Sequence, residues 1–417
     1  MQVENSILNT QVSYNESRKK GRKFSFRTFL FKQFTKLQNV HIIVKDSFGH
    51  YEFGDKNFES IKISVKDPAF YRKAIMGGTM GVSESYLDGE WECEDLYSLF
   101  KVFSSQKSSI KELDGPLTRW TRPYLLFKEW LVKNSLFNTK KNISAHYDLG
   151  NDLFENFLDP TMSYSSALFE SNNNVHKRNL EEASIAKVDR LCQILELKKN
   201  DHLLEIGTGW GYLAIHAAQK YSCRVTSVTL SKNQKKYAED KIKSLGLENQ
   251  ITILLKDYRE LRGQYSKLVS VEMIEAVGPQ YIPSYFKQCR ELLKKDGLAA
   301  LQAITIPDHA YKDHLKNVDF IQKYIFPGSK IPAISVLLNE ASKNGRFVLE
   351  DLKDMSLDYA QTMRSWRKNF KNNINDIRKL GYDERFLRMW DYYLSYCSAG
   401  FQTRYLGTVQ MLLRKHD

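Results

Sequence analysis

A glycine-rich loop with an acid in front of it lies in the middle of the chain. Residues 202–212 read HLLEIGTGWGY, in which an apolar run ends at Glu205 and Ile206 and is followed by Gly207, Gly209 and Gly211. This pattern predicts a buried strand that turns sharply into a helix, so that backbone N–H groups and a helix N-terminus face a ligand. A dinucleotide site is the first interpretation of such a turn, and a purely structural turn is another.

The spacing of these glycines favours a different ligand. A nicotinamide fingerprint has the spacing G-x-G-x-x-G, whereas here the spacing is G-x-G-x-G and the acid Glu205 stands at the strand end. Without a pyrophosphate to hold, a tight loop can approach a methionine group and a nucleoside closely, because glycine has no Cβ. The motif therefore predicts S-adenosylmethionine as the ligand.

Six further motifs follow one another in a single order. They are AHYDLGNDLFENFLDPTMSYSSALFE (145–170), TLSKNQ (229–234), LLKDYREL (254–261), VSVEMIEAVG (269–278), DFIQKYIFPG (319–328) and DYAQTMRSWRKNF (358–370). Together they closely resemble the cyclopropane-fatty-acyl-phospholipid synthase family, including its mycolic-acid relatives. The resemblance runs nearly continuously from Ile143 to the C-terminus, and GVSESYLDGEW (81–91) resembles the family's extra N-terminal domain.

The resemblance implies which residues hold the methyl donor. The glycine loop and Glu205 would hold its methionine part, TLSKNQ would meet its ribose, the DYR segment would lie near its adenine, and two tyrosines with a serine would close over it. The two tyrosines have a second interpretation as core aromatics. The predicted donor-binding residues are Tyr147, Tyr164, Ser165, Glu205, Gly207, Gly209, Thr229, Leu230, Gln234, Asp257, Tyr258 and Arg259.

The chemistry that the resemblance implies is demanding. A carbon–carbon double bond is a poor nucleophile, so its attack on the sulfonium methyl generates a carbocation in an acyl chain. Fixed negative charge and aromatic faces in a dry pocket stabilise such a cation. Proton loss from the new methyl then closes a three-membered ring. In the family the expected base is a bound bicarbonate, held by Cys, Glu, His and Tyr side chains and a backbone group of an Ile.

This sequence keeps part of that bicarbonate cage. Glu275, Tyr359 and Ile304 match the family, whereas Ser166 stands at the family's Cys and Gln302 at its His. Both replacements can form hydrogen bonds, but neutral Gln302 cannot become cationic or relay a proton as histidine can. These five residues are the predicted catalytic residues, and bicarbonate binding stays open. A cation that shifts a hydride before losing its proton would give a methylene- or methyl-branched chain instead of a ring.

The elements that must position these residues alternate regularly. From HLLEI (202–206) to GLAALQAITI (297–306), strand and helix patterns follow each other, which predicts a mostly parallel sheet with ligands at the carboxyl ends of its strands. The expected fold class is α/β: a Rossmann-like seven-stranded class I methyltransferase domain over residues 143–417, preceded by a smaller α/β domain over residues 31–116. A basic tail (1–30) and a linker helix region (117–142) complete the predicted domain organisation.

The region 389–407 (MWDYYLSYCSAGFQTRYLG) carries aromatic and small residues at helical spacing. Core packing is its default interpretation. The functional interpretation is that part of this region, with Tyr324 and Phe326, walls a channel for the acyl chain.

The charge and composition of the chain limit the kinds of partner that it is expected to bind. The net charge is +13, and residues 18–27 read RKKGRKFSFR, which favours an anionic partner. No secretory signal, bilayer-spanning apolar stretch or zinc-like cysteine cluster is seen, and the five cysteines are expected to be reduced and mostly buried. We expect a cytoplasmic methyltransferase, peripherally associated with the inner face of the membrane, that acts on unsaturated phospholipids at an anionic surface and not on nucleic acid. A homodimer, a catalytically inactive lipid-binding protein and an RNA methyltransferase are the alternatives left open.

Overall fold

The chain forms two compact units, residues 1–120 and 121–417. The computed structural model describes residues 25–106, 149–169 and 178–416. Tyr147 and the predicted linker helix region (117–142) therefore lie outside the described residues. Among the described residues, no helix is long and apolar enough to cross a bilayer.

The N-terminal unit is a small α/β structure with a four-stranded sheet in the order β2-β1-β3-β4. Strand β1 is antiparallel to β2 and parallel to β3, and β3 is antiparallel to β4. Helix α1 crosses residue 30, where the sequence placed the end of the basic tail. The elements of this unit are α1 (Phe26–Phe34), β1 (His41–Asp46), β2 (Gly49–Gly54), β3 (Ser60–Val65), α2 (Ala69–Leu87), β4 (Trp91–Cys93) and α3 (Leu96–Ser105).

The motif GVSESYLDGEW has a packing role in this unit. It covers the end of α2 and the start of β4. The Trp91 side chain is almost fully buried, and its Nε1 donates hydrogen bonds to the Val82 carbonyl (3.0 Å) and to Ser85 Oγ (3.1 Å). The indole therefore ties β4 to α2.

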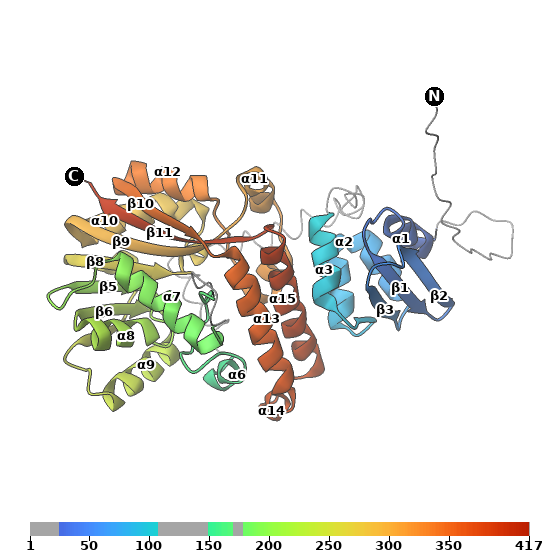
Figure 1. The fold of residues 1–417 in the computed structure, drawn as a ribbon, viewed down its shortest axis with the longest axis horizontal. Helices are drawn as coiled ribbons and strands as arrows, with labels where there is room; N and C mark the ends of the chain where they lie inside the picture. The colour runs from blue at the N-terminus through green and yellow to red at the C-terminus, as the bar shows by residue number, and fades with distance from the viewer. Residues whose placement is uncertain (1–24, 107–148, 170–177, 417) are drawn as a thin grey trace. The chain divides into compact units, whose positions relative to one another are not determined.

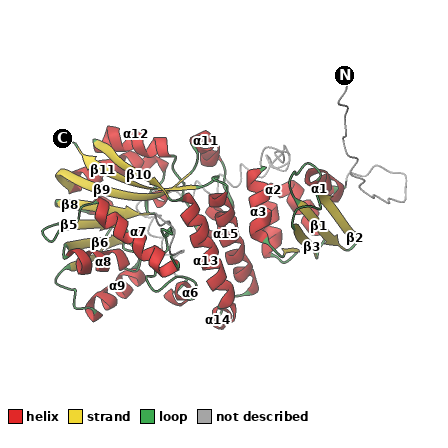
Figure 2. Cartoon of the chain, in the orientation of Figure 1, coloured by secondary structure: helices red, strands yellow, loops and turns green. Residues whose placement is uncertain are grey.

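The second unit has a seven-stranded sheet in the order β10-β11-β9-β8-β5-β6-β7 (Figures 1 and 2). The strands from β9 to β7 are parallel to their neighbours, and β11 is antiparallel to both β9 and β10. This confirms the predicted α/β class. The strands are β5 (His202–Ile206), β6 (Arg224–Thr229), β7 (Ile251–Leu255), β8 (Tyr265–Val271), β9 (Leu293–Thr305), β10 (Phe347–Asp354) and β11 (Gly407–Lys415).

Helices cover both faces of this sheet. Leu203 packs in an apolar cluster with α7 (Leu180–Ile194), α8 (Tyr212–Tyr221) and α9 (Lys232–Ser244), whereas its neighbour Leu204 packs in a second cluster with α10 (Ile282–Leu292) and α12 (Ile334–Gly345). Successive side chains of a strand point to opposite faces of the sheet. A continuous apolar run such as HLLEI is therefore typical of a strand whose sheet is buried on both sides.

The remaining helices and helical turns precede the sheet or lie between its strands in the sequence. Helices α13 and α15 pack against each other (Figure 1). The 19-residue α15 contains most of the aromatic region 389–407, so the helical spacing of that region is confirmed. These elements are α6 (Asn151–Glu155), the 3₁₀ turns η3 (Tyr258–Glu260), η4 (Ile274–Ala276) and η5 (Pro279–Tyr281), α11 (Asp308–Lys316), the π-helical turn η6 (Ile321–Ile325), α13 (Ser356–Asn372), α14 (Ile374–Lys379) and α15 (Glu384–Gln402).

The strand order places a ligand site between β5 and β8. From β5 the chain proceeds through β6 to β7 on one side and then returns to β8 and β9 on the other. In open α/β sheets, ligands bind outside the carboxyl ends of the strands where the order reverses. Glu205 on β5 and Glu272 directly after β8 both lie at this edge.

Candidate active site

The glycine loop connects β5 to α8 with a backbone that favours glycine. Gly207, Gly209 and Gly211 have φ values of +103°, +54° and +90°, which lie in the region that L-residues with a Cβ rarely adopt. A Cβ on Gly211 would lie 2.8 Å from the Ala238 Cβ of α9, whereas a Cβ on Gly209 would meet no heavy atom within 4 Å. Gly211 is therefore needed for packing, and Gly209 faces open space.

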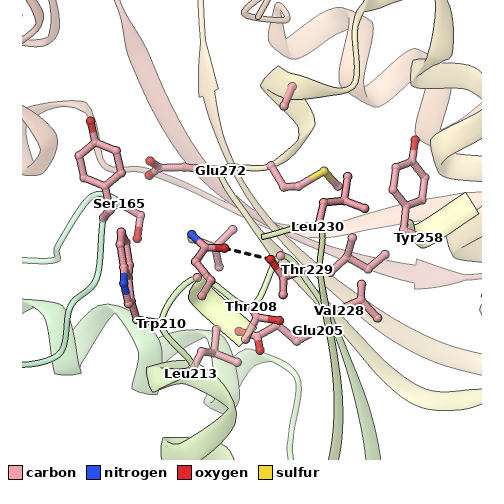
Figure 3. A pocket seen from close by; sticks show the side chains of 18 of the residues that line it. Ser165, Glu205, Thr208, Trp210, Leu213, Val228, Thr229, Leu230, Tyr258 and Glu272 are labelled. Carbon is pink, nitrogen blue, oxygen red and sulfur yellow. Dashed lines mark hydrogen bonds between the residues drawn. The ribbon is translucent and has the colours of Figure 1, made fainter. Parts of the chain in front are cut away.

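That open space is a cavity at the carboxyl ends of β5, β6 and β7, which we call the glycine-loop cavity (Figure 3). Every predicted donor-binding residue that the structure describes lines it. Its lining residues are Met162, Ser163, Tyr164, Ser165, Lys187, Val188, Glu205, Ile206, Gly207, Thr208, Gly209, Trp210, Tyr212, Leu213, Val228, Thr229, Leu230, Gln234, Lys256, Asp257, Tyr258, Arg259, Val271, Glu272, Met273, Ala276 and Val277.

Polar groups on two sides of this cavity are held in place by their neighbours. Thr229 Oγ1 donates to Gln234 Oε1 (2.9 Å), the bond drawn as a dashed line in Figure 3. Arg259 donates from Nε and Nη2 to the two carboxylate oxygens of Asp257, at 2.8 and 2.7 Å. The hydroxyl and amide suit ribose hydroxyls, and the guanidinium–carboxylate pair fixes the loop after β7.

An acid and a lysine lie deeper in the same cavity. Glu205 is buried, accepts a hydrogen bond from Ser227 Oγ (2.5 Å), and burial raises its pKa to about 8. Lys187 of α7 is also buried, donates to Ser165 Oγ (2.8 Å), and burial lowers its pKa. Lys187 was not among the predicted site residues, and it brings an amino group to a cavity where a zwitterionic methionine group is expected. A lysine on the buried face of α7 was the available signal.

A second cavity, which we call the aromatic cavity, adjoins the first. Its walls come in part from η6, α13 and α15. The region 389–407, which was expected to wall an acyl channel, supplies part of them, and so does Phe326. Its lining residues are Tyr164, Glu272, Glu275, Ala276, Ile304, Ile306, His314, Asp319, Ile321, Gln322, Phe326, Pro327, Ser329, Ile331, Tyr359, Met363, Tyr393, Tyr396, Cys397, Phe401, Tyr405 and Leu406.

Tyr324 was expected to wall the acyl channel with Phe326, but it does not line the aromatic cavity. Its ring packs on Phe320, with the ring centroids 5.4 Å apart. Tyr324 and Phe326 are two residues apart, at the end of the π-helical turn η6, so their side chains do not share a face.

Three side chains line both cavities: Tyr164, Glu272 and Ala276. Glu272 follows β8 with a left-handed backbone (φ +49°), and its N–H donates to the Gln302 carbonyl on β9 (2.8 Å). Tyr164 OH and Tyr393 OH share a hydrogen bond of 2.9 Å. A group carried from one cavity to the other would pass beside the Glu272 carboxylate.

Three donors converge on the Glu272 carboxylate. Oε1 accepts from the Ser166 N–H (2.9 Å) and from Gln302 Nε2 (2.7 Å), and Oε2 accepts from Tyr359 OH (2.8 Å). Burial raises the pKa of Glu272, while these hydrogen bonds and the charge of Lys187 oppose that rise. The carboxylate is thus held in one orientation by hydrogen bonds that favour its charged form.

Glu275 on η4 is the second carboxyl group at this place. Its Oε1 accepts from the Ile304 N–H (2.5 Å), and its Oε2 has no hydrogen-bond partner among the described residues. Burial, and secondly the charge of Glu272, raises its pKa to about 8. Of the two acids, Glu272 is the one whose carboxylate accepts several hydrogen bonds that favour its charged form.

Ser166 and Gln302 lie behind Glu272 and do not face a cavity. Both are fully buried, and neither is among the lining residues of either cavity. Ser166 Oγ donates to the Ala167 carbonyl (3.0 Å), and the Gln302 amide oxygen accepts from Gln410 Nε2 (2.9 Å). The hydrogen-bonding groups that were expected to face an anion are used within the protein.

Glu272 was not among the predicted site residues, although it is part of the quoted motif VSVEMIEAVG. The available signal was positional: an acid directly after the strand that neighbours β5 across the switch point. Its importance depends on Tyr359, which lies 87 residues further along the chain.

Comparison with known proteins supports the resemblance drawn from the motifs. The family model of mycolic acid cyclopropane synthetase matches residues 134–411. Tuberculostearic acid methyltransferase UfaA1 of Mycobacterium tuberculosis is 38% identical over 349 residues, which are 83% of this chain and 81% of the relative. Cyclopropane-fatty-acyl-phospholipid synthase of Escherichia coli K12 is 36% identical over 360 residues, which are 85% and 87% of the two chains.

A solved structure from the same family is also similar to this chain. Mycolic acid cyclopropane synthase CmaA1, complexed with SAH and CTAB, has a TM-score of 0.61 and 30% identity, and the match covers 66% of this chain and 98% of that one. Both cavities are lined by residues inside the range that the family model matches. The chain therefore belongs to the mycolic acid cyclopropane synthetase family and is an S-adenosylmethionine-dependent methyltransferase.

Proposed function

We propose that this enzyme transfers a methyl group from S-adenosylmethionine to the cis double bond of an acyl chain in an unsaturated phospholipid, and that the product is a cyclopropane fatty acyl chain. The observation that carries this proposal is the Glu272 carboxylate at the junction of the glycine-loop cavity and the aromatic cavity. The donor's sulfonium lies in the first cavity and the double bond in the second, so positive charge develops beside a fixed negative charge.

The aromatic cavity suits an acyl chain that becomes cationic. Its lining combines apolar side chains with tyrosine and phenylalanine rings, among them Tyr359, Tyr393 and Phe401. The Tyr359 and Phe401 rings are stacked, with centroids 4.3 Å apart. Aromatic faces attract a cation without acting as nucleophiles, so a carbocation can form there without being captured.

A branched acyl chain is the second candidate product. UfaA1, the relative with 38% identity, is named a tuberculostearic acid methyltransferase, and the sphingolipid relatives are named C9-methyltransferases. Gln302, at the position where the family resemblance implies a histidine, is the feature of this chain that agrees with a departure from ring closure. A hydride shift before proton loss would give the methylene- or methyl-branched chain.

The substrate places the enzyme at a membrane surface. We propose that the positively charged protein binds peripherally to the anionic inner face of the cell membrane, because its net charge of +13 attracts acidic head groups. The acyl chains of phospholipids lie inside the bilayer, so the enzyme must draw a chain out of the bilayer into the aromatic cavity. A homodimer is compatible with this arrangement.

Product analysis tests the proposal. The purified protein is incubated with methyl-labelled S-adenosylmethionine and vesicles of monounsaturated phospholipid, saturated phospholipid or, separately, RNA. Label is expected only in the unsaturated lipid, and gas chromatography–mass spectrometry with proton NMR of the methyl esters distinguishes a cyclopropane ring from a branched chain. Labelled RNA would support the nucleic-acid alternative, and a branched ester as the main product would replace the first candidate with the second.

A further inference from the structure

The family resemblance implies a bound bicarbonate as the base that removes the proton from the transferred methyl. The groups expected to hold it here are the Ser166 hydroxyl, the Gln302 amide, the side chains of Glu275 and Tyr359, and the backbone of Ile304. In this chain the Ser166 N–H, Gln302 Nε2 and Tyr359 OH all donate to Glu272, and the Ile304 N–H donates to Glu275. The residues present do not fit a bound anion, because their donors already bind two carboxyl groups of the chain.

Charge argues in the same direction. A bicarbonate at this place would lie against the Glu272 carboxylate, and like charges at such short range disfavour each other's charged form. Among the described residues, the buried Lys187 already acts on Glu205 and Glu272, and it donates its hydrogen bond to Ser165.

We propose that Glu272 is the catalytic base of this enzyme, and that turnover does not require bicarbonate. This inference deepens the proposed function and rests on it. The carboxylate lines both cavities, so it touches the place where the donor's methyl group meets the double bond. Its three hydrogen bonds hold it in the position where the family resemblance implies a free anion.

The oxygen that takes the proton can be named. A carboxylate oxygen has two acceptor sites. Oε1 accepts two hydrogen bonds, from Ser166 and Gln302, whereas Oε2 accepts one, from Tyr359, among the described residues. In the ring-closing step the C–H bond of the transferred methyl breaks, its proton goes to Oε2, and its electron pair forms the new carbon–carbon bond to the cationic carbon.

The backbone of Glu272 allows a sharp test. Its φ of +49° suits glycine better than glutamate, so Glu272→Gly removes the side chain without straining the fold. The variant leaves the Ser166 N–H, Gln302 Nε2 and Tyr359 OH around a vacated space of carboxylate size. Glu272→Gln is the matched control, because its amide fills that space but cannot accept the proton.

The assay compares the three proteins in buffer stripped of bicarbonate and in buffer with added bicarbonate or formate. Wild-type turnover should be the same in all of them. Glu272→Gly should lose activity by about 100-fold or more without bicarbonate, as expected for loss of a general base, and regain it as bicarbonate is added. Glu272→Gln should stay inactive in every buffer. Bicarbonate should also raise the melting temperature of Glu272→Gly but not that of the wild type.

Two results would overturn the inference: wild-type turnover that falls when bicarbonate is removed, or a Glu272→Gly variant that works at the wild-type rate without it. Calorimetric binding of S-adenosylmethionine shows whether each variant is folded, and the wild-type comparison stands without any variant. If the wild type forms no methylated lipid in any buffer, the proposed function has failed, which is a different result from failure of this inference.

Discussion

At the scale of single residues, the two sides of the methyl-transfer site depend on opposite properties. The glycine loop leaves open space because side chains are missing, whereas the junction of the two cavities carries a carboxylate, Glu272, that three hydrogen bonds hold in place. In both places the local backbone is left-handed, at Gly209 (φ +54°) and at Glu272 (φ +49°). Only the glycines could be recognised from residue type, because glycine is the residue that such a backbone favours.

Gly209→Val should abolish donor binding. A Cβ at this position points into open space on the cavity side, so the valine side chain would occupy volume that the donor needs. The loss is measured by calorimetric titration with S-adenosylmethionine. Gly246→Val is the matched control, because Gly246 also has a left-handed backbone (φ +66°) and open space around its Cβ but does not line the cavity. Equal donor affinity in both variants would contradict the assignment.

Glu275→Gln should become more stable relative to the wild type as pH rises. The pKa of Glu275 is about 8 in the folded protein, against about 4.3 in an unfolded chain. Between these values the folded state binds more protons, so the wild type loses roughly 1.4 kcal/mol of stability from this group per pH unit as the pH rises. The glutamine removes that loss.

Urea unfolding of both proteins at pH 5.5 and pH 7.5 measures this difference. The exposed Glu248→Gln serves as the control for the same substitution at the protein surface. A constant difference for Glu275→Gln would mean that Glu275 is ionised throughout this range.

The site also shows how far residue types alone can predict chemistry. Glu275, Tyr359 and Ile304 were predicted from motifs, and the structure brings all three to the aromatic cavity. Ser166 and Gln302 were predicted from the same motifs but lie behind Glu272, and Glu272 itself was missed. Which of two acids three residues apart meets Tyr359 depends on the turn after β8, and the sequence does not specify that turn.

At the scale of elements, the strands of the sheet could be predicted only as far as β9. The alternation of strands and helices is a local pattern, and it gave the parallel strands correctly. Strand β11 lies between β9 and β10, so its place depends on pairing with β9, for example Gln410 opposite Gln302. Such pairing between distant segments leaves no local pattern. Strand β11 nevertheless contacts the candidate site, because Gln410 on this strand donates a hydrogen bond to the Gln302 side chain.

Helix α15 should control access of the acyl chain to the aromatic cavity. Cys397 on this helix lines the cavity and is otherwise buried, so Cys397→Phe would fill part of the space for the chain. Lipid turnover should fall at least tenfold, while the affinity for S-adenosylmethionine should stay unchanged. Cys397→Ser, which conserves the size of the side chain, should keep most of the activity. If both variants turned over lipid equally well, the acyl chain would have to lie elsewhere.

At the scale of the whole molecule, the charge of the protein should govern its binding to membranes. Six of the ten residues from 18 to 27 are lysine or arginine, and the net charge of the chain is +13. Exposed charges are screened within about 8 Å at physiological ionic strength, so attraction to acidic head groups should weaken as salt is added.

Vesicle sedimentation measures that binding. The fraction of protein bound to anionic phospholipid vesicles should fall steeply with increasing salt, and vesicles of neutral phospholipid should bind little protein at any salt concentration. Binding that is independent of salt and of head-group charge would instead indicate insertion of apolar side chains as the main anchor.

The left-handed backbone at Glu272 has a consequence for how such an enzyme can change in evolution. Every glutamate codon becomes a glycine codon through one change at its second base, and a φ of +49° accepts glycine without strain. A single point mutation therefore suffices to remove the base that is part of the chain and to open its place to a dissolved anion. The reverse mutation makes the enzyme's output independent of the inorganic carbon available to the cell.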